Sequence, residues 1–244
     1  MTTFATVLSG LLRTEPGRPL VTFYDHATDE RVELSVTTYA NWVAKAASLL
    51  ADEHDLERGQ TMYVDLPPHW LTPVFLGAAW TVGLVVGDAE DADVVVTGPD
   101  GVASWAGRAD EVVVLACSLR PMGVRFADPL PAGVHDVGIE IWGQPDAFTP
   151  WDPPTGDDDA LPGITQAEMW RTAAAGSLLT DGGRLLSEAN PASPPGIATF
   201  VEPLARSGSL VLVSHAEPGW LEATYTSERA TARFPCADQG PGAG

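Results

Sequence analysis

Lysine is almost missing from this sequence: Lys45 is the only one, and 13 basic residues in all face 33 acidic ones. The formal net charge at pH 7 is −20. A surface of that sign repels phosphate backbones and anionic lipids, so we expect the protein to bind neither nucleic acid nor membranes. Charged residues make up only 19% of the chain and apolar residues 45%, which excludes a largely disordered protein and allows a substantial core.

Cysteine is scarce as well, with Cys117 and Cys236 far apart. Two distant cysteines provide no disulfide framework, and we expect two reduced thiols. The N-terminus, Met1 to Arg13, lacks a cationic start followed by a long apolar run and so does not resemble a secretory signal. The longest apolar stretch, Leu71 to Val86, contains proline and glycine and is too short to span a bilayer. These observations predict a soluble cytoplasmic protein.

Apolar periodicity predicts strands and helices in alternation. Helical spacing marks residues 3–13, 35–50, 69–82, 165–179, 197–206 and 219–227. Short β-branched or apolar runs mark strands at 20–24, 31–34, 61–66, 84–86, 94–97, 111–115, 184–187 and 210–214. This alternation predicts an α/β layer fold, with a mostly parallel sheet and flanking helices.

The composition changes between residues 143 and 163, where four prolines precede an acidic triplet. The change predicts a first α/β subdomain at 1–142, a Pro/Asp-rich loop at 143–163, a second α/β portion at 164–232 and a flexible tail at 233–244. Trp142 and Trp151 flank the loop. We expect both indoles to pack beneath it, with a covered groove as the alternative.

The histidines show no spacing typical of metal ligands, such as i and i+4, so we predict surface histidines and no metal site. The five positions are His26, His54, His69, His135 and His215. A triad of His135 with Asp136 and a serine is disfavoured because the sequence has no Gly-x-Ser-x-Gly motif to expose the nucleophile.

Residues 34–50, LSVTTYANWVAKAASLL, combine a helix cap with a core helix, and residues 59–86 combine a strand, a proline turn and an apolar helix. In this order, these segments resemble the corresponding elements of AMP-forming acyl-CoA synthetases of the adenylate-forming superfamily. LPGITQAEM, at 161–169, is similar to the segment after the family's phosphate loop, and residues 204–213 are similar to a later helix and strand. The resemblance extends over residues 5–232 and implies the N-terminal part of such an enzyme, of an actinobacterial type.

The resemblance places a degenerate phosphate loop within the Pro/Asp-rich segment. Adenylation joins a carboxylate to the α-phosphate of ATP and expels pyrophosphate, so the family site needs amides, hydroxyls, a lysine and magnesium. The aligned residues in this sequence are Thr155, Gly156, Asp157, Asp158, Asp159, Pro162 and Gly163. None of them is a lysine. Two unit charges about 4 Å apart cost roughly 4 kcal/mol at an effective dielectric of about 20, so three carboxylates repel a triphosphate. A solvated turn is favoured over a magnesium site on the aspartates.

The resemblance also implies that other parts of the family site are missing. The adenine-binding strands and the C-terminal domain have no counterpart in the sequence, and Ser193 stands where the family has a histidine that gates the acyl pocket. We therefore expect no catalytic residues, no metal and no cofactor, with ATP and magnesium disfavoured.

The leading functional hypothesis is a binding or protein-interaction module that does not adenylate. One alternative is residual binding of an acyl or adenine-nucleotide ligand in the ancestral cleft. The other is an acyl-adenylating ligase completed by a partner chain that donates the missing lysine.

Overall fold

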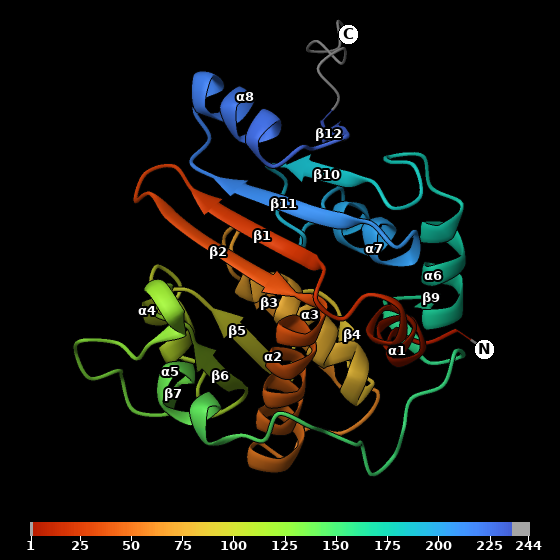
Figure 1. Cartoon of the computed structure of the whole chain (residues 1–244). Coiled ribbons are helices and arrows are strands. Elements are labelled where there is room, and N and C mark those ends of the chain that lie inside the picture. Colours follow the sequence, from red (N-terminus) through yellow and green to blue (C-terminus); the bar gives the residue numbers. More distant parts are fainter. Residues whose placement is uncertain (1, 236–244) are drawn as a thin grey trace, which may run out of the picture.

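The computed structural model describes residues 2–235. Cys236 and most of the predicted tail, 233–244, lie outside the described residues. Two five-stranded sheets and a two-stranded hairpin carry the fold, with helices packed against them (Figure 1). The predicted α/β class with mostly parallel strands is confirmed.

The first sheet, sheet A, joins strands from both ends of the chain. Its order is β12-β10-β11-β1-β2, and every neighbouring pair is parallel except β1 with β2. The strands are β1 (Pro19–Asp25), β2 (Glu30–Ser35), β10 (Arg184–Ser187), β11 (Ser209–Ser214) and β12 (Ala232–Phe234). All six residues of β11 are buried, as expected for a central strand covered on both faces. The predicted subdomain boundaries stay a prediction, but the first and last thirds of the chain share this sheet.

The second sheet, sheet B, is entirely parallel and comes from one continuous part of the chain. Its order is β4-β3-β5-β6-β7. The strands are β3 (Thr61–Asp65), β4 (Val85–Val86), β5 (Val94–Thr97), β6 (Val113–Ala116) and β7 (Val134–Asp136). The four residues of β5 are all buried, which explains why their run of valines is unbroken by polar residues.

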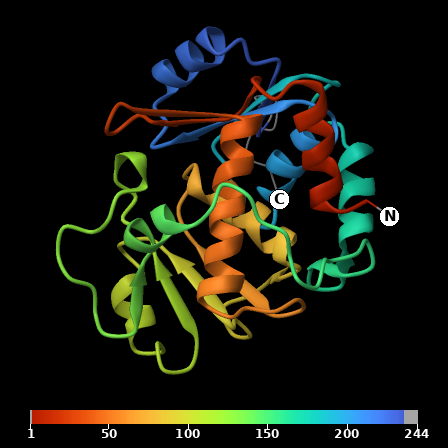
Figure 2. The same cartoon turned by 60° about the horizontal axis from the view of Figure 1, so that its bottom comes forward.

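One apolar core connects the helices to both sheets. The longer helices are α1 (Phe4–Thr14), α2 (Val36–Ser48), α3 (Leu71–Val82), α6 (Gln166–Ala174), α7 (Ile197–Ala205) and α8 (Pro218–Ser227). In both views α2 lies between strands β5 to β7 of sheet B on one side and helices α1 and α6 on the other (Figures 1 and 2). Helix α3 is buried nearly all round, as its apolar sequence predicts. No helix among residues 2–235 is both long and apolar enough to cross a bilayer.

Helix ends follow capping residues in the sequence. Ser35 accepts a hydrogen bond from the backbone N–H of Thr38 at 3.1 Å and begins α2, as predicted. The predicted helix at 165–179 ends earlier, at Ala174. There the carboxylate of Glu202 accepts hydrogen bonds from the backbone N–H groups of Leu178 and Leu179, so these two residues turn toward α7.

Several short elements were not predicted from the sequence. They are the π-helical turn η1 (Leu49–Glu53), α4 (Val102–Ala106), β7, α5 (Val137–Glu140), the 3₁₀ turns Pro121–Gly123 and Ile141–Gly143, and the hairpin strands β8 (Asp159–Leu161) and β9 (Ile164–Thr165). The hairpin corrects the prediction of a loop through residue 163, because β8 pairs antiparallel with β9.

Candidate functional site

A cleft of about 640 Å³ lies where strands of sheet B end. The carboxyl ends of β3 and β4 form one wall, and the β8–β9 hairpin and the segment before α7 form the others. Its lining residues are Tyr63, Val64, Asp65, Leu66, Val86, Gly87, Asp88, Leu161, Pro162, Ile164, Asn190, Ala192, Ser193, Pro194 and Ile197. The carboxyl edge of parallel strands is the usual place for a ligand in open α/β sheets, so this cleft is the candidate site.

The polar groups in the cleft are mostly held by the protein itself. The Asp65 carboxylate accepts hydrogen bonds from the Thr97 hydroxyl at 3.1 Å and the Trp105 indole N–H at 2.8 Å. The Asn190 amide donates to the Leu66 carbonyl at 2.6 Å, and the Ser193 hydroxyl donates to the Asn190 carbonyl at 2.7 Å. These contacts fix the walls, and the remaining lining is chiefly apolar.

Two residues singled out by the resemblance meet at this cleft. Pro162, from the degenerate phosphate loop, and Ser193, at the position of the family's gating histidine, both line it. The structure therefore joins two parts of the resemblance that are 31 residues apart in the sequence.

The remaining residues of the degenerate phosphate loop form a closed turn. The Asp158 carboxylate accepts hydrogen bonds from the backbone N–H of Thr155 at 2.6 Å and from its hydroxyl at 3.0 Å. The Asp159 carboxylate accepts one from the backbone N–H of Gly163 at 3.3 Å. Asp157 is exposed, and Gly156 is buried. Asp158 and Asp159 thus accept hydrogen bonds from donors of their own backbone segment.

Hydrogen bonds to buried side chains anchor the β8–β9 hairpin to the core. The Trp80 indole N–H donates to the Ala160 carbonyl at 3.0 Å, and the Gln166 side-chain amide donates to the Trp80 carbonyl at 2.9 Å. The Gln166 side-chain oxygen accepts from the backbone N–H of Phe4 at 2.8 Å. Because Trp80, Ala160 and Gln166 are all buried, these bonds hold the hairpin at a fixed place beside α3.

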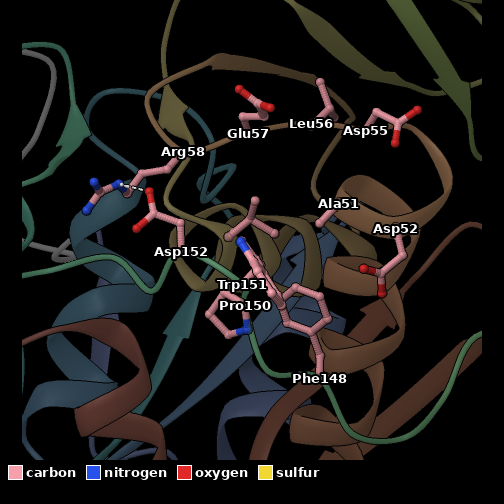
Figure 3. Close-up of a pocket in the computed structure, with 11 residues that line it drawn as sticks. Ala51, Asp52, Asp55, Leu56, Glu57, Arg58, Phe148, Pro150, Trp151 and Asp152 are labelled. Carbon is pink, nitrogen blue, oxygen red and sulfur yellow. Dashed lines mark ion pairs between the residues drawn. The ribbon is translucent and has the colours of Figure 1, made fainter.

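A cation, Arg58, lies beside the acidic triplet. The Arg58 guanidinium is 3.4 Å from the Asp158 carboxylate and 3.0 Å from that of Asp152. Figure 3 shows the pair with Asp152 at the wall of a second cavity, of about 370 Å³. Lys45 instead pairs with Asp146 at 3.1 Å. Arg58 is already neutralised by two carboxylates, so it is not a free cation for a phosphate.

The two tryptophans near the loop behave differently from each other. Trp142 is 48% exposed and packs edge-on against Trp42, with ring centroids 5.4 Å apart. Trp151 is fully exposed and lines the second cavity together with Phe148 (Figure 3). The prediction that both indoles pack beneath the loop is therefore wrong for Trp151.

Of the histidines predicted to lie on the surface, His69 is buried and His54 is half-buried. His69 is 4% exposed, packs 4.9 Å from the Phe23 ring, and burial lowers its pKa to about 4. The side chain of His54 is 7% exposed and contacts Glu140. His135 also bonds to Glu140, not to a serine, which leaves no triad at this position. Cys117 is 1% exposed and lies in the core, and this burial raises the pKa of its thiol.

Comparison with known proteins gives one close relative. No model of a known protein family matches the chain. A protein of Mycobacterium tuberculosis (strain ATCC 25618 / H37Rv), described as a TIGR03089 family protein, is 35% identical over 236 residues. The match covers 92% of this chain and 95% of the relative, so the two have nearly the same extent.

The solved structures with the same fold are longer than this chain, by about half to about twofold. An acyl-CoA synthetase from Brucella canis superposes with a TM-score of 0.80 at 15% identity, over 95% of this chain and 47% of that one. The N-terminal domain of FACL13 from Mycobacterium tuberculosis superposes with a TM-score of 0.69 at 15% identity, over 94% of this chain and 62% of that one. The chain thus spans about half to three fifths of these structures and shares the fold of their N-terminal parts.

The extent and identity of the Mycobacterium match decide the family, while the solved structures decide the fold. Having the fold of the N-terminal part of acyl-CoA synthetases, this chain belongs to the TIGR03089 family.

Proposed function

We propose that the protein binds a small, largely apolar molecule, such as an acyl group, in the cleft beside Pro162 and Ser193, and that it does not activate this molecule with ATP. The observation that carries the proposal is the closed turn, in which Asp158 takes both donors of Thr155. A phosphate at this turn would have to displace a carboxylate and would meet like charge. The Mycobacterium relative supports the actinobacterial type that the resemblance implies.

The size and lining of the cleft support a small-molecule ligand. Pockets for such ligands usually measure about 300–1,000 Å³ and have chiefly apolar walls with a few polar groups. The cleft has about 640 Å³, with walls that include Leu66, Val86, Leu161 and Ile197. Its volume and surface therefore suit an acyl chain or a ring of moderate size.

Charge favours a neutral ligand over a nucleotide. Asp65 and Asp88 are the charged residues of the lining, and no lysine or arginine accompanies them among the described lining residues. A ligand with a carboxylate or phosphate would hold that group outside the cleft, in water. We therefore rank esters, amides and thioester-bound acyl groups above AMP or ATP.

Ligand-induced stabilisation tests the proposal. Thermal unfolding of the full chain is followed with ATP, AMP, coenzyme A, free fatty acids, and neutral acyl esters and amides. A ligand at 100 times its dissociation constant adds about 2.7 kcal/mol of stability, so binding of a neutral acyl compound gives a clear upward shift. No shift with any apolar compound, or a shift with ATP alone, contradicts the proposal.

Filling the cleft is the matched control. Ala192 lines the cleft, whereas Ala103 is exposed on α4. Ala192→Phe is expected to abolish the ligand-induced shift, and Ala103→Phe to leave it unchanged. An unchanged shift in Ala192→Phe places the ligand elsewhere.

The interaction role expected from the sequence is favoured by one observation. Trp151 is fully exposed at the wall of the second cavity, which Arg58 also lines. Tryptophan is enriched at protein interfaces. A photo-crosslinking residue at position 151 is expected to trap a protein in cells, while the same residue at Ala103 is not. The absence of a specific adduct at 151 counts against an interaction role.

A further inference from the structure

Two histidines and one glutamate from three separate segments meet at the side of sheet B. His54 directly follows the π-helical turn η1, His135 lies in β7, and Glu140 ends α5. The Glu140 carboxylate lies between the imidazoles, with Oε2 at 2.9 Å from His54 Nε2 and Oε1 at 3.0 Å from His135 Nδ1. The two rings are 4.4 Å apart between centroids and stand at 77° to each other.

We propose that His54, His135 and Glu140 form a binding site for one divalent transition-metal ion, with zinc as the best match. Each side chain offers one ligand atom, and these atoms all lie within 4.8 Å of one another. Among residues 2–235, this is the one such group of three. The site goes beyond the proposed cleft function and does not depend on it.

The spacing of the ligand atoms suits zinc after small side-chain rotations. Zinc binds histidine nitrogen and carboxylate oxygen at about 2.0–2.2 Å, so two ligands of a tetrahedral ion lie about 3.3 Å apart. The His54–Glu140 and His135–Glu140 separations are 2.9 and 3.0 Å, each to a different oxygen of the carboxylate. With one ligand atom per residue the three atoms lie within 4.8 Å of one another, so side-chain rotation would draw them to the zinc spacing. An ion between the three groups would replace two hydrogen bonds with three coordination bonds.

The backbone fixes two of the three ligands. Glu140 lies five residues after His135, across the junction of β7 and α5, where the Asp136 side chain accepts from the backbone N–H of Gly138 at 2.9 Å. His54 is placed by the π-helical turn, since its backbone N–H donates to the Leu49 carbonyl at 3.2 Å. Single π-turns occur often at functional sites, because they reorient one side chain relative to the preceding helix.

The surroundings are negative and reachable from solvent. His135 lines two cavities, of about 390 and about 370 Å³, and each cavity contains one of the other two ligands. Besides Glu140, the charged residues that line them are Asp55, Asp93, Asp110, Glu111, Asp128, Asp136 and Arg125. Six acidic groups against one arginine favour a cation. The cavities also leave room for water at a fourth coordination position, as in three-ligand zinc sites.

Imidazole and carboxylate together select the class of metal. Two neutral imidazoles favour zinc and its first-row neighbours, whereas calcium and magnesium prefer oxygen ligands alone. The competing explanation is a carboxylate that holds two imidazoles by hydrogen bonds and binds no metal. Titration with Zn²⁺ and Co²⁺ separates the two.

The test is titration of the untagged, metal-free full chain with Zn²⁺ by calorimetry, and with Co²⁺ by visible absorption. We expect one Zn²⁺ per chain, and Co²⁺ bands of a low-coordinate site with nitrogen ligands. His54→Gln, His135→Asn and Glu140→Gln each place an amide near the lost ligand atom, so a hydrogen bond survives while coordination is lost. Each variant is expected to weaken Zn²⁺ binding by more than about tenfold.

His215→Asn is the matched control, because His215 also pairs with a carboxylate, Asp25 at 2.8 Å, but lies outside the cluster. It should bind Zn²⁺ like the unaltered chain. If His54→Gln fails to fold, the Zn²⁺ affinity of His135→Asn decides. The His135 side chain is 41% exposed, so this substitution should leave the fold intact. No Zn²⁺ binding by the unaltered chain, or binding by His135→Asn and Glu140→Gln as tight as that of the unaltered chain, overturns the proposal.

Discussion

The Asp158 carboxylate accepts hydrogen bonds from both the backbone N–H and the hydroxyl of Thr155, at 2.6 and 3.0 Å. An acidic side chain therefore takes up both donors of its own turn, and the same Asp158 carboxylate also pairs with the Arg58 guanidinium at 3.4 Å.

Removing this carboxylate should loosen the hairpin. Asp158→Ala leaves two donors of Thr155 to water, and we expect a loss of about 1 kcal/mol in unfolding free energy, since both groups are partly exposed. Asp158→Asn keeps an acceptor and should lose less. Asp157→Ala, on an exposed neighbour, should stay within about 0.5 kcal/mol in urea unfolding. A larger loss in Asp157→Ala than in Asp158→Ala contradicts this role.

Gly77 should tolerate no side chain. A Cβ at this position in α3 would lie 2.3 Å from the Tyr39 hydroxyl and 2.7 Å from the Phe4 ring. Gly77→Ala is expected to cost about 1–3 kcal/mol through overpacking of the core. Gly10 in α1 has nothing within 4 Å of a built Cβ, so Gly10→Ala should stabilise the protein by about 0.5–1 kcal/mol. Chemical unfolding of both variants measures the contrast, and a neutral Gly77→Ala would show that the helices pack less closely.

The buried imidazole of His69 should make stability depend on pH. Burial lowers its pKa to about 4, whereas the unfolded chain takes up the proton near pH 6.5. Between these values the unfolded state binds more protons, so stability falls as the pH drops from about 6.5 to about 4, by about 2–4 kcal/mol in total. His69→Asn keeps an acceptor for the Leu71 N–H and should flatten this slope. An unchanged slope in unfolding experiments would exclude His69 as its source.

Glu228 should contribute in a lower pH range. Burial raises its pKa, but hydrogen bonds from Tyr24, Arg184 and Arg31 outweigh burial, and the net pKa lies below the usual value. The contribution of Glu228 is therefore complete above the unfolded pKa of about 4.3 and is lost as pH falls through the lower folded value.

The matching experiment compares Glu228→Gln with the unaltered chain. We expect the variant to lose about 1.5–3 kcal/mol near neutral pH, because Glu228 accepts from charged groups and its side chain is 10% exposed. The difference should shrink once both states are protonated. A difference that grows on acidification has the opposite sign and would refute the assignment.

The fold followed from the sequence wherever local signals were strong. The strand at Val94–Thr97 and the Ser35 cap were predicted at their observed positions, because β-branched runs and caps act within a few residues. The β8–β9 hairpin was missed because β8 has three residues and depends on the distant Trp80 indole.

The candidate site followed only in part. The resemblance drew attention to Pro162 and Ser193, which line the cleft. It gave no sign of the Arg58–Asp158 pair, whose members are 100 residues apart, or of His54 beside Glu140, 86 residues apart. Such contacts arise from tertiary packing, so no pattern of spacing within the sequence predicts them.

The most direct test of the account is ATP–pyrophosphate exchange by the purified chain, with magnesium and a panel of short, medium and aromatic carboxylic acids. With Thr155 and Gly163 bonded to aspartates, we predict no exchange above the rate without enzyme. Exchange that depends on a carboxylic acid, and that Ala192→Phe abolishes, would contradict the central claim.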